Sequence, residues 1–167
     1  TVVSRRLARG YDAERADGRL TWMQFDPASS STWADAGLLD ALNQADAVVN
    51  LAGEPIAEKR WTPTHRQLLE TSRLETTSQL VKAIEDCATP PKLLVNASAI
   101  GFYGSSLDKR FLESSTPGDD FLASLCERWE AAAEAVPAAV RQVTLRIGIV
   151  LAADGGALGK MLPVFRT

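Results

Sequence analysis

Short apolar runs alternate with longer amphipathic stretches along this chain. The runs VVNLA and LLVNA carry apolar residues at both parities, the pattern of strands that are covered on both faces of a sheet. The stretches between such runs repeat their apolar positions at three- and four-residue spacing, which favours helices and hence a parallel sheet of βαβ units. Thr62 before Pro63 predicts one helix start, and Asp119 or Asp120 predicts another. We predict strands over Thr1–Ser4, Leu20–Phe25, Ala47–Leu51, Leu93–Ala97 and Val143–Val150, and helices near Ala34–Gln44, Pro63–Asp86 and Asp120–Val136.

Both apolar runs end in polar or small residues. Asn50 is followed by Ala52 and Gly53, and Asn96 is followed by Ser98. In an open α/β sheet, ligands bind outside the carboxyl ends of the strands. The sequence therefore predicts a functional site where these two strands end.

Composition and charge make several kinds of function improbable. The chain of 167 residues has the size of one domain, and its net charge of −3 gives no general attraction to nucleic acid or to an anionic membrane. Cys87 and Cys126 stand outside any CxxC motif, so we expect reduced thiols and no metal site. His65 is expected to be exposed in the first turn of a helix. The apolar runs stay below the ~18 residues of a membrane span, and reduced thiols are typical of the cytosol, so we expect a cytoplasmic protein. We also expect a small-molecule substrate, which the sequence does not identify.

Several motifs together resemble one protein superfamily. In chain order they are DAVVNLAGEPI, KRWTPTHRQLLETSRLETTSQLVKAI, NASAIGFYG, CERWEAAA and LRIGIVLAADGGALGKMLPVFR. The sequence resembles the extended or atypical short-chain dehydrogenases/reductases, and more closely their NAD(P)-dependent epimerase family. This resemblance implies an α/β fold with a doubly wound parallel Rossmann sheet. It further implies a cofactor-binding domain over residues 1–150 and the start of a small C-terminal substrate lobe over 151–167.

The resemblance also implies a feature that this chain lacks. Members of the family carry a GxxGxxG turn after their first strand, whereas this sequence begins at what corresponds to the second strand. We therefore expect a fragment of a longer protein without strand one and its glycine-rich loop. Two strands should then have unpaired edges in the middle of the fold, and the fragment alone should bind dinucleotide weakly.

The end of the first predicted strand bears on the choice of cofactor. It reads Ser4-Arg5-Arg6, with no acidic residue before Asp12. An arginine at this place accommodates the 2′-phosphate of NADP, whereas an acidic residue binds the ribose of NAD. We expect Ser4 and Arg5 to bind NADP, with NAD as the other possibility. A solvated basic turn is the alternative.

Further cofactor contacts follow from the resemblance alone. Leu51, Ala52 and Gly53 correspond to the stretch along the adenine ribose and pyrophosphate, and Ile149 to the loop that passes the nicotinamide carboxamide. Arg73 corresponds to an active-site asparagine, which would place a cation beside the cofactor or an acidic substrate. An ion pair of Arg73 with Glu70 or Glu75 on a solvated helix face is the alternative.

The acid/base residues depart from the superfamily pattern. Ser98 matches the catalytic serine, but Cys126 and Glu130 stand where a YxxxK motif would supply tyrosine and lysine. Three functions remain open. One is an NADP-dependent oxidoreductase in which Glu130 carries the proton, and another is a catalytically silent NADP-binding sensor or scaffold. The third is a sugar-nucleotide epimerase or dehydratase, against which the missing tyrosine and lysine argue.

Overall fold

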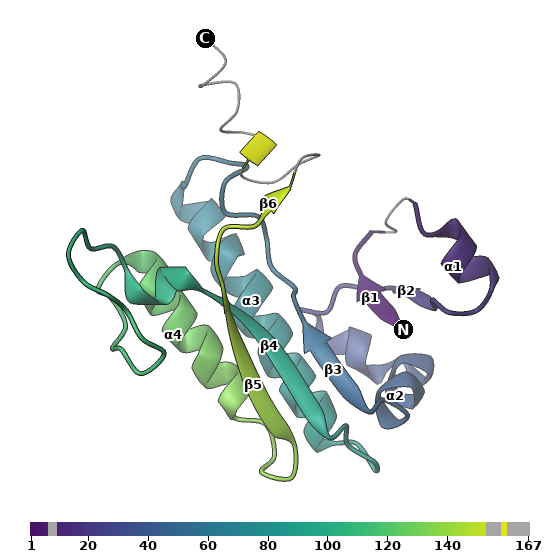
Figure 1. Ribbon diagram of the computed structural model, residues 1–167. Coiled ribbons are helices and arrows are strands. Elements are labelled where there is room, and N and C mark those ends of the chain that lie inside the picture. Colours follow the sequence, from purple (N-terminus) through teal and green to yellow (C-terminus); the bar gives the residue numbers. More distant parts are fainter. Residues whose placement is uncertain (7–9, 153–157, 160–167) are drawn as a thin grey trace.

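Strands and helices alternate along the chain in the computed structural model, which describes residues 1–6, 10–152 and 158–159 (Figure 1). The elements are β1 (Val2–Ser4), α1 (Asp12–Ala16), β2 (Trp22–Gln24), the 3₁₀ helix η1 (Ser30–Ala34), α2 (Ala36–Asn43), β3 (Ala47–Asn50), α3 (Pro63–Glu85), β4 (Leu93–Ala99), the 3₁₀ helix η2 (Ile100–Tyr103), α4 (Phe121–Glu134), β5 (Arg141–Ile147) and β6 (Leu151–Ala152).

The main strands form two parallel sheets. β1 pairs with β2, while β3, β4 and β5 form a second sheet in that order. Asn50 lies opposite Asn96, and Asn96 lies opposite Thr144, so the carboxyl ends of the three strands meet at one edge. Within the described ranges the two sheets share no strand pairing. A cavity of about 1150 Å³ lies between β1 and β3, as expected for strands with unpaired inner edges. The predicted Rossmann-like parallel fold is confirmed.

Helices α3 and α4 lie side by side on one face of the larger sheet (Figure 1). On this face the apolar core joins strand and helix residues, among them Leu94 and Ile84, which are fully buried. Burying a side chain of this size contributes about 1.5–3 kcal/mol. On the other face Val49 is 58% exposed. The apolar pattern predicts strands that are covered on both faces, but the described helices cover only one face of this sheet.

The helix starts follow local capping chemistry. The side chain of Thr62 accepts a hydrogen bond from the backbone N–H of His65 at 3.2 Å, with Pro63 in the first helical position of α3. The side chain of Asp120 likewise accepts a hydrogen bond from the backbone N–H of Ala123 at 2.8 Å. Asp120, and not Asp119, is therefore the N-cap of α4.

Several expectations about individual elements were wrong. His65 is only 6% exposed, so its predicted solvent position is incorrect. The helix expected from Ala34 begins at Ala36, because Asp35 has extended backbone and caps α2 after η1. The last long strand ends at Ile147 rather than Val150, and α1 was not anticipated. Most of the substrate lobe predicted over 151–167 lies outside the described residues.

Candidate functional site at the carboxyl ends of the strands

A buried polar cluster joins the ends of β3 and β4 to the helices. Asn50 donates from Nδ2 to Asn96 Oδ1 at 2.7 Å and to Thr77 Oγ1 at 3.0 Å. Trp129 of α4 donates to the same Thr77 hydroxyl at 2.9 Å. Asn50 Oδ1 in turn accepts the backbone N–H of Ala52 at 3.2 Å, which fixes the turn after β3. Because these polar groups satisfy one another, the cluster holds the strand ends in place.

Beyond this cluster, Ser98 and Glu130 form the centre of the candidate catalytic site. Ser98 lies near the end of β4 and Glu130 on α4, and both side chains are buried. Ser98 Oγ donates a hydrogen bond to Glu130 Oε1 at 2.5 Å. The residues that the sequence singled out as catalytic on these two elements are therefore in direct contact.

Arg146 of β5 completes this centre and was missed in the sequence. Its Nε donates to Glu130 Oε1 at 3.0 Å and its Nη2 donates to Glu130 Oε2 at 2.8 Å, which makes a bidentate salt bridge. The Nη1 group donates to the hydroxyl of Tyr103 and to the backbone carbonyl of Glu113, each at 2.8 Å. The guanidinium also lies 3.6 Å from the ring centre of Phe102. The hydrogen bond to Glu130 is the main cause that raises the pKa of Arg146.

Cys126 occupies the same corner of the molecule. Burial raises the pKa of its thiol, and the charge of Glu130 raises it further. A hydrogen bond with Ser98, one with the backbone of Ala99 and the nearby Arg73 act in the opposite direction without cancelling that rise. Ser98, Cys126 and Glu130 thus gather as predicted, and the thiol is disfavoured as a thiolate.

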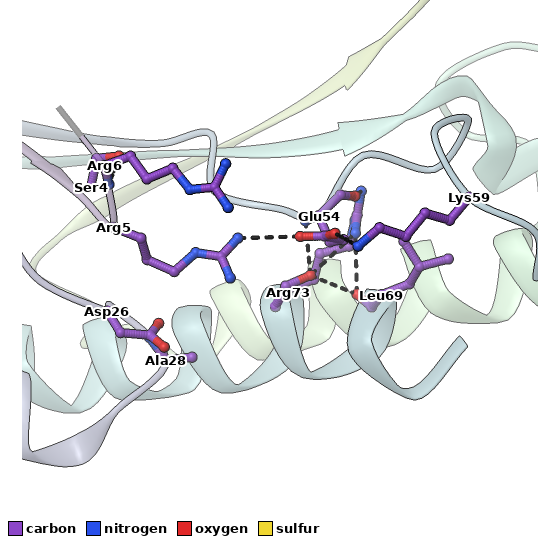
Figure 2. A network of polar contacts seen from close by, with 10 residues as sticks. Ser4, Arg5, Arg6, Asp26, Ala28, Glu54, Lys59, Leu69 and Arg73 are labelled. Carbon is purple, nitrogen blue, oxygen red and sulfur yellow. Dashed lines mark hydrogen bonds and ion pairs between the residues drawn. The ribbon is translucent and has the colours of Figure 1, made fainter. Parts of the chain in front are cut away.

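The second part of the site lies around the end of β1 and is shown in Figure 2. Arg5 Nη2 donates to Glu54 Oε2 at 3.3 Å, and Lys59 Nζ donates to Glu54 Oε1 at 3.4 Å. Partial burial works to raise the pKa of Glu54, but the hydrogen bonds and charges of Arg5 and Lys59 outweigh it and lower the pKa. Ser4 accepts the backbone N–H of Arg6 at 3.3 Å.

Arg73 connects α3 with the loop after β3. Its Nη1 donates to the carbonyl of Leu69 and its Nη2 to the carbonyl of Glu54, each at 3.1 Å. The guanidinium lies 5.3 Å from the ring centre of Trp129, and burial lowers its pKa. These contacts exclude the surface ion pair that the sequence left open as the alternative for Arg73.

Gly53 makes room for this guanidinium. A Cβ atom at position 53 would meet Arg73 Cζ at 3.0 Å and Nη2 at 3.1 Å. Contacts this short are tighter than nine in ten real Cβ contacts, so a side chain here would require the Arg73 guanidinium to shift by a few tenths of an ångström. The sequence indicated a small residue at this place, and the structure identifies Arg73 as its immediate neighbour.

Most of the residues predicted to bind the cofactor line the cavity between β1 and β3. Ser4, Arg5, Leu51, Ala52 and Gly53 all line it. A second cavity of about 90 Å³ also touches Arg5, Ala52 and Gly53, and is otherwise lined by Asp26, Pro27, Ala28, Leu68, Thr71, Ser72 and Thr76.

These linings fit a phosphate-bearing ligand, because Arg5 supplies a cation beside backbone that carries no bulky side chains. Ile149 lines neither cavity and is 68% exposed, so the described residues do not bring it to this part of the site.

Neither a metal centre nor a membrane span is found within the described ranges. No group of three or more histidine, cysteine, aspartate or glutamate side chains is arranged to hold a metal ion there. None of the helices in those ranges is long and apolar enough to cross a membrane.

Known proteins resemble this chain in both sequence and structure. The human epimerase family protein SDR39U1 is 40% identical over 167 residues, which is 95% of this chain and 53% of the relative. The structure of human SDR39U1 with NADPH aligns with a TM-score of 0.74 at 36% identity, covering 99% of this chain and 50% of that one. A nucleoside-diphosphate sugar epimerase from Corynebacterium glutamicum aligns with a TM-score of 0.70 at 29% identity, covering 98% and 36%.

The comparisons bear on the family of the chain. No family model matches the chain, and the chain spans about half the length of the human relative. The human and mouse relatives and the human structure are nevertheless all described as epimerase family proteins, the Corynebacterium neighbour is described as a sugar epimerase, and the parallel fold agrees with both. The chain belongs to the epimerase family of the atypical short-chain dehydrogenases/reductases.

Proposed function

We propose that the complete protein binds NADP(H) and uses Ser98 and Glu130 to move a proton at a substrate oxygen, as an NADP-dependent oxidoreductase. The observation that carries this proposal is the 2.5 Å hydrogen bond between Ser98 and Glu130 at the carboxyl edge of the sheet. A buried hydroxyl in contact with a buried carboxylate is a pair through which a proton can pass.

Cofactor binding is assigned to the cavity beside β1. Arg5 binds the 2′-phosphate through charge-assisted hydrogen bonds, and Ser4 adds a hydroxyl. Ala52 and Gly53 leave their backbone accessible to the ribose and pyrophosphate. The human relative was crystallised with NADPH, which supports this choice of cofactor.

The proton path follows from the hydrogen-bond directions. Ser98 donates to Glu130, and a hydroxyl has two lone pairs, so Ser98 can also accept from a substrate hydroxyl. In the oxidising direction the substrate proton passes to Ser98, whose own proton passes to Glu130. The bound cofactor supplies the hydride acceptor for the hydrogen on the substrate carbon. In the reducing direction both transfers run backwards, and Glu130 starts protonated.

A second candidate function is a cofactor-binding protein without turnover. It is favoured by the pairing of Glu130, whose two carboxylate oxygens both accept from Arg146. A carboxylate whose two oxygens are both held by a guanidinium can serve a purely structural role, which is what a protein without turnover requires.

A labelled-hydride experiment on the complete protein separates the two functions. Labelled NADPH is incubated with a panel of ketones, aldehydes and nucleotide sugars, using the wild-type protein, Glu130→Gln and Glu127→Gln. Glu127 is an exposed neighbour on the same helix and serves as the matched control. The oxidoreductase predicts label transfer that falls about 10²–10⁴-fold in Glu130→Gln and is unchanged in the control.

Two outcomes would contradict the proposal, one for the role of Glu130 and one for the oxidoreductase itself. Full turnover in Glu130→Gln would remove the proton-carrier role, and absence of transfer with normal NADPH binding would favour the silent binder. Cofactor choice is tested separately with Arg5→Ala. We expect about ten- to a hundredfold weaker NADPH binding, because a hydrogen bond to a charged group contributes about 1.5–3 kcal/mol. NADH binding should change little, and equal losses for both cofactors would refute the assignment.

A further inference from the structure

Arg5, the residue assigned to the cofactor phosphate, already has an anionic partner within the chain. Its partner is the Glu54 carboxylate, which comes from the loop after β3, 49 positions along the sequence. Figure 2 shows the side chains of Arg5 and Arg6 extending in the same direction from the end of β1, towards Glu54. A ligand phosphate that binds Arg5 must therefore replace or share this carboxylate.

The backbone of Glu54 is fixed on both sides. Its N–H donates to Ser72 Oγ at 2.9 Å, and its carbonyl accepts from Arg73 Nη2 at 3.1 Å. Both partners belong to α3, which also packs in the core of the larger sheet. The backbone of Glu54 is therefore held in position by the fold, whether or not Arg5 is paired with the carboxylate, and this keeps the side chain near Arg5.

The carboxylate is shielded, whereas its two cations are accessible. The Glu54 side chain is 13% exposed, compared with 50% for Arg5 and 60% for Lys59. Arg5 and Lys59 can consequently turn towards an arriving anion while Glu54 stays in place. The lowered pKa of Glu54 keeps the group charged at neutral pH.

We propose that Glu54 is a specificity-determining residue that competes with the 2′-phosphate of the cofactor for Arg5. The inference rests on the proposed NADP site. A ligand with a 2′-phosphate must exchange the carboxylate for itself and tolerate a fixed negative charge nearby. A ligand without that phosphate leaves the Arg5–Glu54 pair intact. Glu54 thus lowers affinity only for ligands that carry a 2′-phosphate, and Lys59 offsets this effect by neutralising part of the carboxylate charge.

The test uses 2′,5′-ADP and 5′-ADP as probes of the complete protein, with binding measured by calorimetry at low ionic strength. Glu54→Gln keeps the backbone hydrogen bonds but removes the charge. Glu58→Gln is the matched control, because Glu58 lies exposed in the same loop. We expect Glu54→Gln to bind 2′,5′-ADP about three- to tenfold more tightly, which is the range of a partly exposed ion pair plus the relieved repulsion.

The control ligand and the control variant should show no change in affinity. Binding of 5′-ADP by Glu54→Gln should match the wild type, and Glu58→Gln should bind both probes as the wild type does.

Lys59→Met should weaken 2′,5′-ADP binding about twofold, because Glu54 then pairs with Arg5 alone. Adding salt should shrink all of these differences. Unchanged or weaker binding of 2′,5′-ADP by Glu54→Gln would overturn the inference.

Failure of the inference can be told apart from failure of the proposed function. If the wild-type protein does not prefer 2′,5′-ADP and Arg5→Ala has no effect, the NADP site is wrong and the role of Glu54 falls with it. If the wild type prefers 2′,5′-ADP, Arg5→Ala removes that preference and Glu54→Gln behaves as the wild type, only the role of Glu54 is refuted.

Discussion

Replacing Arg146 by methionine tests the central ion pair most directly. Methionine keeps much of the apolar part of the side chain but removes the guanidinium, so the buried Glu130 loses its bidentate salt bridge. The side chains of Arg146 and Glu130 are only 21% and 9% exposed. Removing one member of such a buried pair typically costs about 3–5 kcal/mol, because the other charge stays uncompensated. We expect Arg146→Met to lower the free energy of unfolding by that amount.

A double-mutant cycle isolates the contribution of the pair. Urea unfolding of the complete protein is followed for Arg146→Met, Glu130→Gln and the double variant, with midpoints and slopes compared. The double variant should be more stable than the sum of the single losses predicts, by about 1–3 kcal/mol, because it contains no unpaired charge. Contacts of Arg146 with Tyr103 and Phe102 are lost in both backgrounds and cancel in the cycle.

Two results would show that the Arg146–Glu130 pair itself contributes no free energy of folding. A loss below about 1 kcal/mol for Arg146→Met would place the pair among ordinary surface ion pairs. Strict additivity in the cycle would mean that Arg146 stabilises the protein through its ring and carbonyl contacts alone.

Three further predictions concern the surroundings of the site. Gly53→Ala should displace Arg73 and destabilise the protein by about 1–3 kcal/mol in thermal or urea unfolding, and a change below about 0.5 kcal/mol would show that Arg73 adapts. Cys126 should resist iodoacetamide at pH 8 in the folded protein, because burial raises its pKa; rapid alkylation there would contradict this. Asp120→Ala should cost about 0.5–2 kcal/mol of stability through the lost cap of α4, whereas Asp119→Ala, one residue earlier, should be close to neutral.

The sequence was sufficient for the features that depend on local pattern. Apolar residues at both parities identified β3 and β4, Thr62 identified the start of α3, and the pair Asp119-Asp120 located the start of α4 to within one residue. Cys126 and Glu130 share a helix face because they stand four positions apart, so their common approach to the strand that carries Ser98 could be predicted as well.

Features that depend on long-range register could not be predicted in this way. Arg146 contacts Glu130 only because β5 pairs with β4 so that Ser98 lies opposite Arg146. The pair of Arg5 and Glu54 joins residues from different sheets. A charged residue between Leu145 and Ile147 in an apolar strand was the available signal for Arg146, since such a residue needs a buried partner.

Arg146 also gives a physical reason why the exchanged acid/base residues are tolerated. In the superfamily pattern a lysine on the helix supplies a positive charge beside a tyrosine. In the alignment that the sequence resemblance predicts, Glu130 stands at the lysine position and would add a buried negative charge beside the Cys126 thiol. The guanidinium of Arg146 on the neighbouring strand offsets that charge. The superfamily pattern has one cation beside neutral hydroxyl groups, whereas this chain has a neutral ion pair beside the Ser98 hydroxyl and the Cys126 thiol. The cation thus lies on β5 instead of α4, and Glu130 and Arg146 are expected to be functional only together.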